Sequence, residues 1–322
     1  MTGPRLLSTA PRAGDIAGLV GAATDADAVA PLSEHGLLRV QHGEPGEGHD
    51  VVALAGNDIG GYAYLDEPDG PEVTGELVVH PAHRRQGLGT ALVGALAAAA
   101  EGHALRLWAH GDLDAAAALA RSAGFERFRA LWQMRRSLRE PLPPASFPAG
   151  VSVRTFRPGQ DEGPWLRLNA RAFAKHPEQG GWTTRDIELR ESEPWFDPAG
   201  FFIAERDGAM TGFHWTKIHP AGTAAGEAPI GEVYVVGVDP DAHGGGLGKA
   251  LTLAGLHHLR DRGQDRVMLY VDEDNVPAIR MYSELGFTRW RADAMYRRSA
   301  GSRGTTPAPP GTRGTGACVS GC

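Results

Sequence analysis

The chain has 322 residues, which is enough for two domains at roughly 100–200 residues each. Apolar residues make up 42% of it, and its formal net charge of −7 argues against a general nucleic-acid binder, which needs clustered Lys and Arg. No apolar run approaches the ~20 residues that span a bilayer, and residues 1–15 lack the apolar core of a signal peptide. We therefore expect a cytoplasmic protein with no membrane contact.

The first half contains a β-branched run that ends in a proline and passes through glycines into a helix. Residues 76–96 read ELVVHPAHRRQGLGTALVGAL, and residues 88–100 are strongly helix-favouring. A proline-rich stretch, REPLPPASFPAG at 139–150, then predicts a linker, because prolines do not fit a helix interior.

The second half repeats this organisation. Residues 235–256 read VVGVDPDAHGGGLGKALTLAGL, and the two Gly-Leu-Gly copies are offset by 246 − 87 = 159 residues. We expect a helix over 249–260, a buried strand over 266–271, and a helix over 275–287 closed by Gly286. From residue 299 the chain is rich in Gly, Pro, Ser and Thr and predicts a disordered tail.

The only cysteines, Cys318 and Cys322, fall in this tail, so the folded body has no disulfide framework and no thiolate metal site. An incidental tail is favoured over a redox device. His257 and His258 lie in the middle of the expected helix without carboxylates at ligand spacing, so we interpret them as surface or packing residues. No metal site is indicated.

Each glycine loop predicts a phosphate site. A strand that enters a helix through glycines aims several backbone N–H groups at one point, where the helix dipole adds positive charge. A P-loop fits poorly, because its first glycine would be His243 and the residue after Lys249 is Ala250. A dinucleotide fold also fits poorly, because no G-x-G-x-x-G opens an early βαβ unit.

The block of strand, proline, glycine loop and helix resembles the acyl-CoA signature of the GCN5-related N-acetyltransferase (GNAT) family. The tandem arrangement is similar to that of the mycothiol synthase family, supported by the segments AFAKHPEQGGWT, GFHWTKIHP, GEVYVVGVDP and MLYVDEDNVPAIRMYSELGF. The resemblance implies an α+β (mixed α/β) fold of two tandem GNAT domains, each with a mixed, mostly antiparallel sheet flanked by helices. It implies a cofactor-binding first domain (1–140), a linker (141–150), a catalytic second domain (151–298) and a tail (299–322).

The activity that the resemblance implies is transfer of acetyl from acetyl-CoA to the cysteinyl amine of cysteinyl-glucosaminyl-inositol. We expect a monomer, because two fused domains satisfy the usual pairing within one chain. Two alternatives stay open: an acetyltransferase for another amine, such as a protein N-terminus or an aminoglycoside, and a non-catalytic acyl-CoA-binding regulator.

The resemblance also implies contacts with acetyl-CoA in both halves. Those in the first half are Leu77, Val78, Val79, Arg85, Gln86, Gly87, Leu88, Gly89 and Thr90. Those in the second half are Val236, Gly237, Val238, His243, Gly244, Gly245, Gly246, Leu247, Gly248, Lys249, Asn275, Val276, Pro277, Ala278, Ile279 and Arg280. The family usually has arginines at the positions of Gly244 and Gly245, so two side-chain contacts with phosphate are missing here.

The chemistry requires a base to deprotonate the amine and an acid to meet the departing CoA thiolate. Glu232 opens the key strand of the second half, and we expect it to be the general base, acting through water. Tyr282 lies on the helix after the last core strand, where the superfamily resemblance implies the general acid. The alternatives are a strand-edge carboxylate and a core tyrosine.

The repeat offers an internal comparison. Counting back from the matched prolines and glycines, Glu232 corresponds to Val73, and Tyr282 to Ala120. Glu72 is adjacent, but in a regular strand it points to the opposite face from Val73. The first half is therefore expected to bind acetyl-CoA without catalysis.

Contacts with the acceptor follow from the resemblance alone. They are Glu34, Glu178, Lys217, Glu232 and Tyr270. For Glu34 an alternative is open, because Ser33-Glu34 also reads as the start of a helix.

Overall fold

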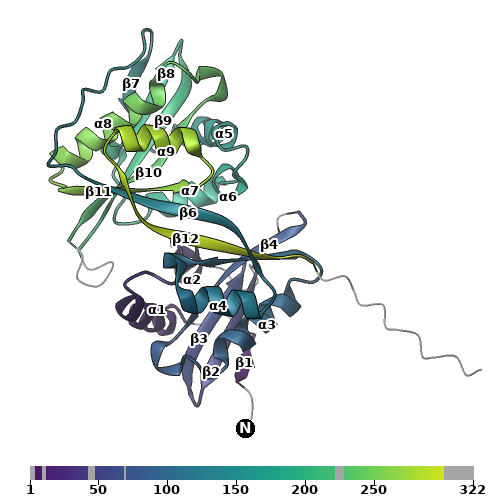
Figure 1. The fold of residues 1–322 in the computed structure, drawn as a ribbon. Helices are drawn as coiled ribbons and strands as arrows, with labels where there is room; N and C mark the ends of the chain where they lie inside the picture. Colours follow the sequence, from purple (N-terminus) through teal and green to yellow (C-terminus); the bar gives the residue numbers. More distant parts are fainter. Residues whose placement is uncertain (1–3, 9–11, 43–47, 69, 222–227, 301–322) are drawn as a thin grey trace, which may run out of the picture.

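The computed structural model describes residues 4–300 except 9–11, 43–47, 69 and 222–227. Cys318, Cys322 and nearly all of the expected tail lie outside the described residues. The chain forms two lobes, one for each half of the sequence, joined by the two long strands β6 and β12 (Figure 1).

The described residues of the first half form six strands, four α-helices and two 3₁₀ turns. They are β1 (Arg5–Leu7), α1 (Ala13–Asp27), α2 (Glu34–His42), β2 (His49–Ala55), β3 (Asp58–Leu65), β4 (Glu72–Val79), η1 (Pro81–His83), α3 (Leu88–Ala99), β5 (Ala104–Ala109), η2 (His110–Asp112), α4 (Asp114–Ser122) and β6 (Glu126–Ser137). The helix expected at 88–100 is confirmed as α3.

The second half repeats this order. Its elements are β7 (Ser152–Thr155), α5 (Glu162–Ala172), α6 (Pro177–Gly180), α7 (Thr184–Glu191), η3 (Pro198–Gly200), β8 (Phe201–Arg206), β9 (Ala209–His219), β10 (Ile230–Val238), η4 (Pro240–Ala242), α8 (Leu247–Asp261), β11 (Arg266–Asp272), α9 (Val276–Glu284) and β12 (Thr288–Arg298). The helices expected at 249–260 and 275–287 and the strand at 266–271 are confirmed, and Gly286 follows α9 with a φ of 84°.

In the part of the chain that the structure describes, one sheet of 12 strands runs through both halves, in the order β1-β2-β3-β4-β5-β12-β6-β11-β10-β9-β8-β7. The halves exchange their last strands, because β12 pairs with β5 of the first half and β6 pairs with β11 of the second. Both exchanges cover edges that would otherwise present unpaired N–H and C=O groups. The exchange makes the two sequence repeats a single structural unit.

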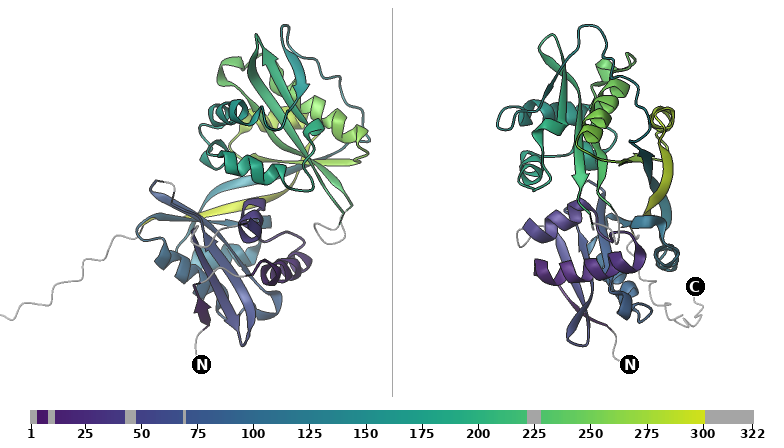
Figure 2. Two further views of the ribbon diagram at one scale, coloured as in Figure 1. Left: turned by 180° about the vertical axis from the view of Figure 1, so that it is seen from behind. Right: turned by 90° about the vertical axis from the view of Figure 1, so that its left-hand side faces the viewer.

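Helices cover the two faces of this sheet (Figure 2). On one side, α1 packs on Tyr62 and Val78 in the first half, and α5 packs on Phe213 and Trp215 in the second. On the other side, α3 packs on Ala63, and α8 and α9 pack on strand residues of the second half. Adjacent strand residues therefore face different helix layers.

Residues 139–150 contain no helix or strand, as expected of a linker, but they pack along the second half. Leu142 and Ala145 lie against the core formed with α8 and α9, and the carbonyl of Pro143 accepts a hydrogen bond from His257 Nε2 at 2.8 Å. His258 packs against Phe202, so the two histidines of α8, which were expected as surface or packing residues, have such contacts.

Replacing Gly255 by alanine is expected to destabilise the fold. A Cβ at this position of α8 would lie 2.1 Å from Cε1 of His214, a fully buried ring whose Nδ1 bonds the Leu251 carbonyl. Overpacking of this kind costs about 1–3 kcal/mol. The matched control is Gly94→Ala on α3, where a Cβ meets nothing within 4 Å and alanine gains up to about 1 kcal/mol of helix propensity. Urea unfolding of both variants measures the difference, and equal midpoints would contradict the prediction.

Candidate active site

The two glycine loops have the same backbone geometry. Gly87 and Gly246 begin α3 and α8 with φ of 87° and 80°, and the residues two positions earlier, Arg85 and Gly244, also have positive φ, at 63° and 93°. Gly244 therefore occupies a left-handed position without the strain that Arg85 carries. The first N–H groups of both helices have no acceptor within the helix and are free to bind phosphate.

The first loop borders a pocket of about 460 Å³. Seven of the residues expected to contact acetyl-CoA line it: Leu77, Val78, Val79, Arg85, Gly87, Gly89 and Thr90. Of the other two, Leu88 is buried in the core and Gln86 donates to the Ala82 carbonyl at 3.3 Å. Arg84 forms a bidentate ion pair with Asp27, and each of its two hydrogen bonds is 2.7 Å long.

This pocket opens because β4 and β5 separate. Their parallel pairing runs only from Glu72–Ala104 to Gly75–Leu107, while β4 continues to Val79. In the second half, the pairing of β10 with β11 likewise stops at Val233–Leu269, although β10 continues to Val238. The residues expected to contact acetyl-CoA on β10, Val236 to Val238, lie in the part that pairs with β9 but not with β11.

Glu232 lies at the point where β10 and β11 separate. It is buried, and His219 Nε2 lies 2.6 Å from its Oε2. Lys217 is its direct partner on β9, and alternation places His219 on the same face of that strand. Met268 is the partner of Glu232 on β11, so alternation places Tyr270, two residues further along, on the same face as Glu232. The Tyr270 hydroxyl accepts a hydrogen bond from Gln133 at 2.7 Å.

Tyr282 lies on the opposite face of the sheet. It belongs to the core that α8 and α9 form over Val233, the neighbour of Glu232, and its ring packs edge-on against Phe287. Burial raises the pKa of the Tyr282 phenol above its usual value, so it stays protonated near neutral pH. The expected base and acid therefore face the separated strands from two sides.

The internal comparison with Val73 needs a correction. The pairing of β9 with β10 shifts register between Val233 and Val235, which makes Tyr234 an extra residue, whereas β3 pairs with β4 without a shift. Thr74, rather than Val73, therefore matches Glu232 in the sheet, because a bulge changes the face on which every earlier residue lies. Thr74 has no carboxylate, so the inference that the first half lacks this base still follows.

Glu72 lies on the same face of β4 as Thr74. Two arginines hold its carboxylate, Arg106 at 3.0 Å and Arg297 at 2.9 Å. Ala120, which matches Tyr282, lines the first pocket.

Glu34 crosses from the first half to the second. It begins α2, and its carboxylate bonds Lys217 and the hydroxyl of Tyr234. Burial raises the pKa of Glu34, but the Lys217 charge and these hydrogen bonds outweigh burial and lower it below the usual range. Lys217 also lies 4.2 Å from the centre of the Trp195 ring, a cation–π contact. Glu178 lies in α6, and its side chain is not among those described.

Other residues expected at the second cofactor site have defined partners. Asn275 caps α9, because its Oδ1 accepts from the Ala278 N–H at 3.3 Å, while Val276 is exposed beside it. Lys249 forms an exposed ion pair with Glu284 at 3.2 Å, and His243 Nε2 lies 3.1 Å from the Val238 carbonyl.

Two family models match the chain. Residues 47–127 match the acetyltransferase (GNAT) domain, and residues 165–287 match the acetyltransferase (GNAT) family. The mycothiol acetyltransferase of Thermobispora bispora is 58% identical over 280 residues, covering 87% of this chain and 94% of that one. That of Thermomonospora curvata is 57% identical, covering 90% and 94%. The chain belongs to the mycothiol acetyltransferase family.

A solved structure shows the same fold. The tandem GNAT protein from the clavulanic acid biosynthesis pathway aligns with a TM-score of 0.69 at 22% identity, over 93% of this chain and 99% of that one. The expected fold of two tandem GNAT domains is confirmed. The expectation that the protein is an acetyltransferase is confirmed as well.

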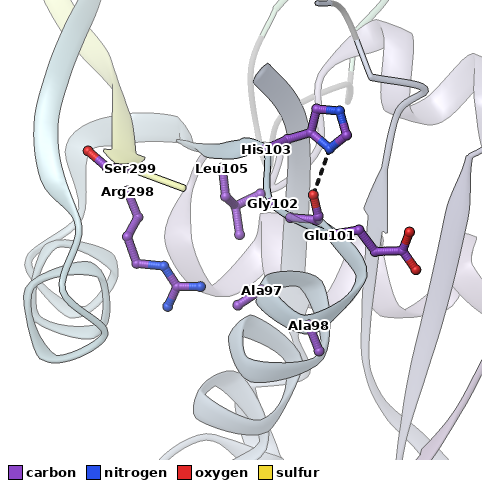
Figure 3. Close-up of a pocket in the computed structure, with 9 residues that line it drawn as sticks. Ala97, Ala98, Glu101, Gly102, His103, Leu105, Arg298 and Ser299 are labelled. Carbon is purple, nitrogen blue, oxygen red and sulfur yellow. Dashed lines mark hydrogen bonds between the residues drawn. The ribbon is translucent and has the colours of Figure 1, made fainter. Parts of the chain in front are cut away.

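Among the described residues of this family member, no group of three or more His, Cys, Asp or Glu could hold a metal ion. None of the helices described is both long and apolar enough to cross a membrane. A further pocket lies at the end of α3, lined by residues such as Glu101, His103 and Arg298 (Figure 3). Figure 3 shows the carboxylate of Glu101 directed away from Arg298, and His103 Nδ1 bonds the Ala100 carbonyl at 2.8 Å.

The sequence did not single out His219, Tyr234 or Arg190. His219 has a signal in the sequence, because alternation along β9 places it on the face of Lys217. Tyr234 reaches Glu34 only because it is the bulged residue, and Arg190 donates to the Tyr234 hydroxyl at 2.8 Å. Neither of these two contacts has a local signal in the sequence.

His110 lies buried between two carboxylates at the junction of the halves. Its Nε2 is 3.1 Å from Glu76 and its Nδ1 is 3.1 Å from Asp293. Burial lowers its pKa, but the hydrogen bonds to Asp293 and Glu76 outweigh burial and raise the pKa to about 10. The imidazole is therefore charged at neutral pH and donates from both nitrogens.

Replacing His110 by glutamine is expected to remove part of the pH dependence of stability. A histidine pKa that rises on folding stabilises fully below the unfolded value of about 6.5, and this contribution is lost as pH rises through about 10. Breaking such a buried pair costs about 3–5 kcal/mol. Urea unfolding from pH 6 to 10.5 should show the wild-type free energy falling more steeply than that of His110→Gln. Parallel curves would contradict the prediction.

Proposed function

We propose that this protein transfers acetyl from acetyl-CoA to the cysteinyl amine of cysteinyl-glucosaminyl-inositol, which gives mycothiol and CoA. Its relatives in Thermobispora bispora and Thermomonospora curvata are mycothiol acetyltransferases, which supports the mycothiol product. The observation that carries the chemistry is the position of Glu232, buried where β10 and β11 separate and bonded to His219. We take residues 1–140 and 151–298 as the two domains and 141–150 as the linker between them.

Acetyl-CoA fits both glycine loops. The free N–H groups at the start of each helix suit the pyrophosphate. The ends of β4 and β10, beyond the point where each separates from its parallel neighbour, have backbone groups that suit the amides of the pantetheine arm. In the first half, the loop and strand residues lie around one pocket of about 460 Å³. In the second half, the backbone N–H groups of 243–249 donate to the phosphates in place of the side chains of the missing arginines.

Glu232 and Tyr282 divide the proton transfers. Glu232 accepts a proton from the ammonium group of the acceptor through water, and the free amine attacks the thioester carbonyl. The carbon–sulfur bond then breaks, and the Tyr282 phenol donates its proton to the CoA thiolate. The position of the two groups on opposite faces of the sheet supports this division, since the thioester would lie between the separated strands.

The acceptor would bind on the Glu232 face. Its hydroxyl groups would form hydrogen bonds with the side chains on this face, which are those of Glu34, Lys217 and Tyr270. Helix α2 of the first half closes one side of this site. The first half has Thr74 and Ala120 in place of the acid–base pair, so it binds acetyl-CoA without catalysis. Because both strand exchanges occur within one chain, a monomer has no need of a second copy at these edges.

The decisive experiment is turnover of acetyl-CoA with cysteinyl-glucosaminyl-inositol against a panel of protein N-termini and aminoglycosides. Products are followed by mass spectrometry, because the acceptor and CoA both carry thiols. We expect the cysteinyl compound to have the highest kcat/KM. Preference for another amine would change the substrate and leave the acetyl transfer, whereas binding of acetyl-CoA with no turnover of any amine would favour a regulator.

A further inference from the structure

A cluster of buried charges connects the first half to the acceptor site. Glu76 lies on β4, His110 follows β5, and Asp293 comes from β12, the strand that the second half contributes. All three side chains are almost completely buried, and two carboxylates share one imidazolium. Burying charged side chains is costly, and the proton transfers above use none of these three.

Glu76 uses its second oxygen to hold the start of α2. Its Oε2 accepts the backbone N–H of Ser33 at 2.9 Å, while Oε1 bonds His110. The approach is close, because a Cβ on Gly36 would lie 2.7 Å from the same Oε2. Ser33 in turn accepts the Gly36 N–H on its hydroxyl at 3.1 Å. The first turn of α2 therefore has a fixed position over Glu76.

Glu34 is the next residue along, and its side chain leaves this turn for the second half. It bonds Lys217, the direct partner of Glu232, and the hydroxyl of Tyr234. At its other end the cluster is equally fixed, since Asp293 also accepts the Gly111 N–H at 2.7 Å. A series of hydrogen bonds thus runs from Asp293 on the exchanged strand through His110 and Glu76 to the backbone of Ser33, the residue before Glu34.

We propose that Glu76 and His110 are positioning residues for acetyl transfer, which hold the first turn of α2 so that Glu34 contacts the acceptor in the second half. This gives the non-catalytic half a direct role in acceptor binding. His110 also lines the pocket beside the first glycine loop, so one side chain borders that pocket and bonds Glu76. The inference rests on the proposed contact between Glu34 and the acceptor.

The test compares Glu76→Gln with Glu34→Gln. A lost hydrogen bond to a charged group is worth about 1.5–3 kcal/mol, so each variant should raise the KM for the acceptor by roughly 10–100-fold. The kcat and the KM for acetyl-CoA should stay within about twofold of the wild type. Glu76→Asp is the second variant, because it keeps the charge of the cluster and shortens the reach to Ser33.

The matched control is Glu72→Gln on the same strand. Glu72 also pairs with the exchanged strand β12, through Arg297, but it does not bond α2. This variant should lower the unfolding midpoint and leave the acceptor KM unchanged.

The double variant Glu34→Gln/Glu76→Gln decides whether Glu76 acts through Glu34. If it does, the acceptor KM of the double variant equals that of Glu34→Gln alone. Multiplied effects, or an unchanged acceptor KM in both Glu76 variants, would overturn the inference while Glu34→Gln still shows its effect. If Glu34→Gln itself has a normal KM, the proposed acceptor contact fails and the inference fails with it.

Discussion

Glu232→Gln is expected to lower kcat by about 10²–10⁴-fold, the range that a positioned general base contributes. Glutamine keeps the size of the side chain and its place beside His219, but it cannot accept the proton of the acceptor ammonium. The KM for acetyl-CoA should change little, because the glycine loop at 243–249 is untouched. Steady-state kinetics, together with calorimetric binding of acetyl-CoA, measures both quantities.

The pH profile separates a lost base from a damaged fold. With the base removed, kcat of the variant should rise with pH as the amine loses its proton to solvent, and its unfolding midpoint should match that of the wild type. Thr74→Val, at the matching position of the first half, is the control and should keep full kcat. Substantial activity at neutral pH in Glu232→Gln would remove Glu232 from the catalytic role.

Tyr282→Phe is expected to lower kcat by about 10²-fold or more, because the departing thiolate loses its proton donor. Phenylalanine keeps the ring that packs against Phe287, so the core over Val233 should persist. The loss should be largest when C–S cleavage limits the rate. A thioester with a more acidic thiol as leaving group should therefore recover part of the lost activity.

The control for Tyr282→Phe is Tyr62→Phe in the first half. That hydroxyl donates to Asp50 at 2.6 Å, far along the chain from the catalytic strands. The same loss of one oxygen there should lower stability and leave kcat unchanged. If Tyr282→Phe keeps wild-type kcat with both thioesters, Tyr282 is a core tyrosine and the acid lies elsewhere.

Local sequence patterns were sufficient for three elements of the second half. Leucines at helical spacing predicted α8, the run RVMLYV predicted β11, and Gly286 predicted the end of α9. These features depend on neighbours within a few residues, so they can be read without the rest of the chain. The same holds for Asn275, whose side chain caps the helix that it precedes.

The bulge at Tyr234 could not be predicted from local sequence patterns. Counting from Pro240 matched Glu232 with Val73, because the count assumed that both strands are regular. One extra residue moves the match to Thr74 and turns the Tyr234 hydroxyl towards Glu34. The extra residue is visible only in the pairing with β9, which a single strand does not reveal.

The sequence by itself determined the tandem repeat and the two glycine loops, since each is a short pattern with its own physical cause, whereas the roles of Glu232 and Tyr282 as base and acid stay predictions. Tertiary structure decided the exchange of β6 and β12, the bulge, and the cluster of Glu76, His110 and Asp293. His110 and Asp293 are 183 residues apart along the chain, and Glu34 and Lys217 are equally distant. Contacts of that span depend on which strand edges pair, and the free energy that selects the pairing comes from the whole sheet.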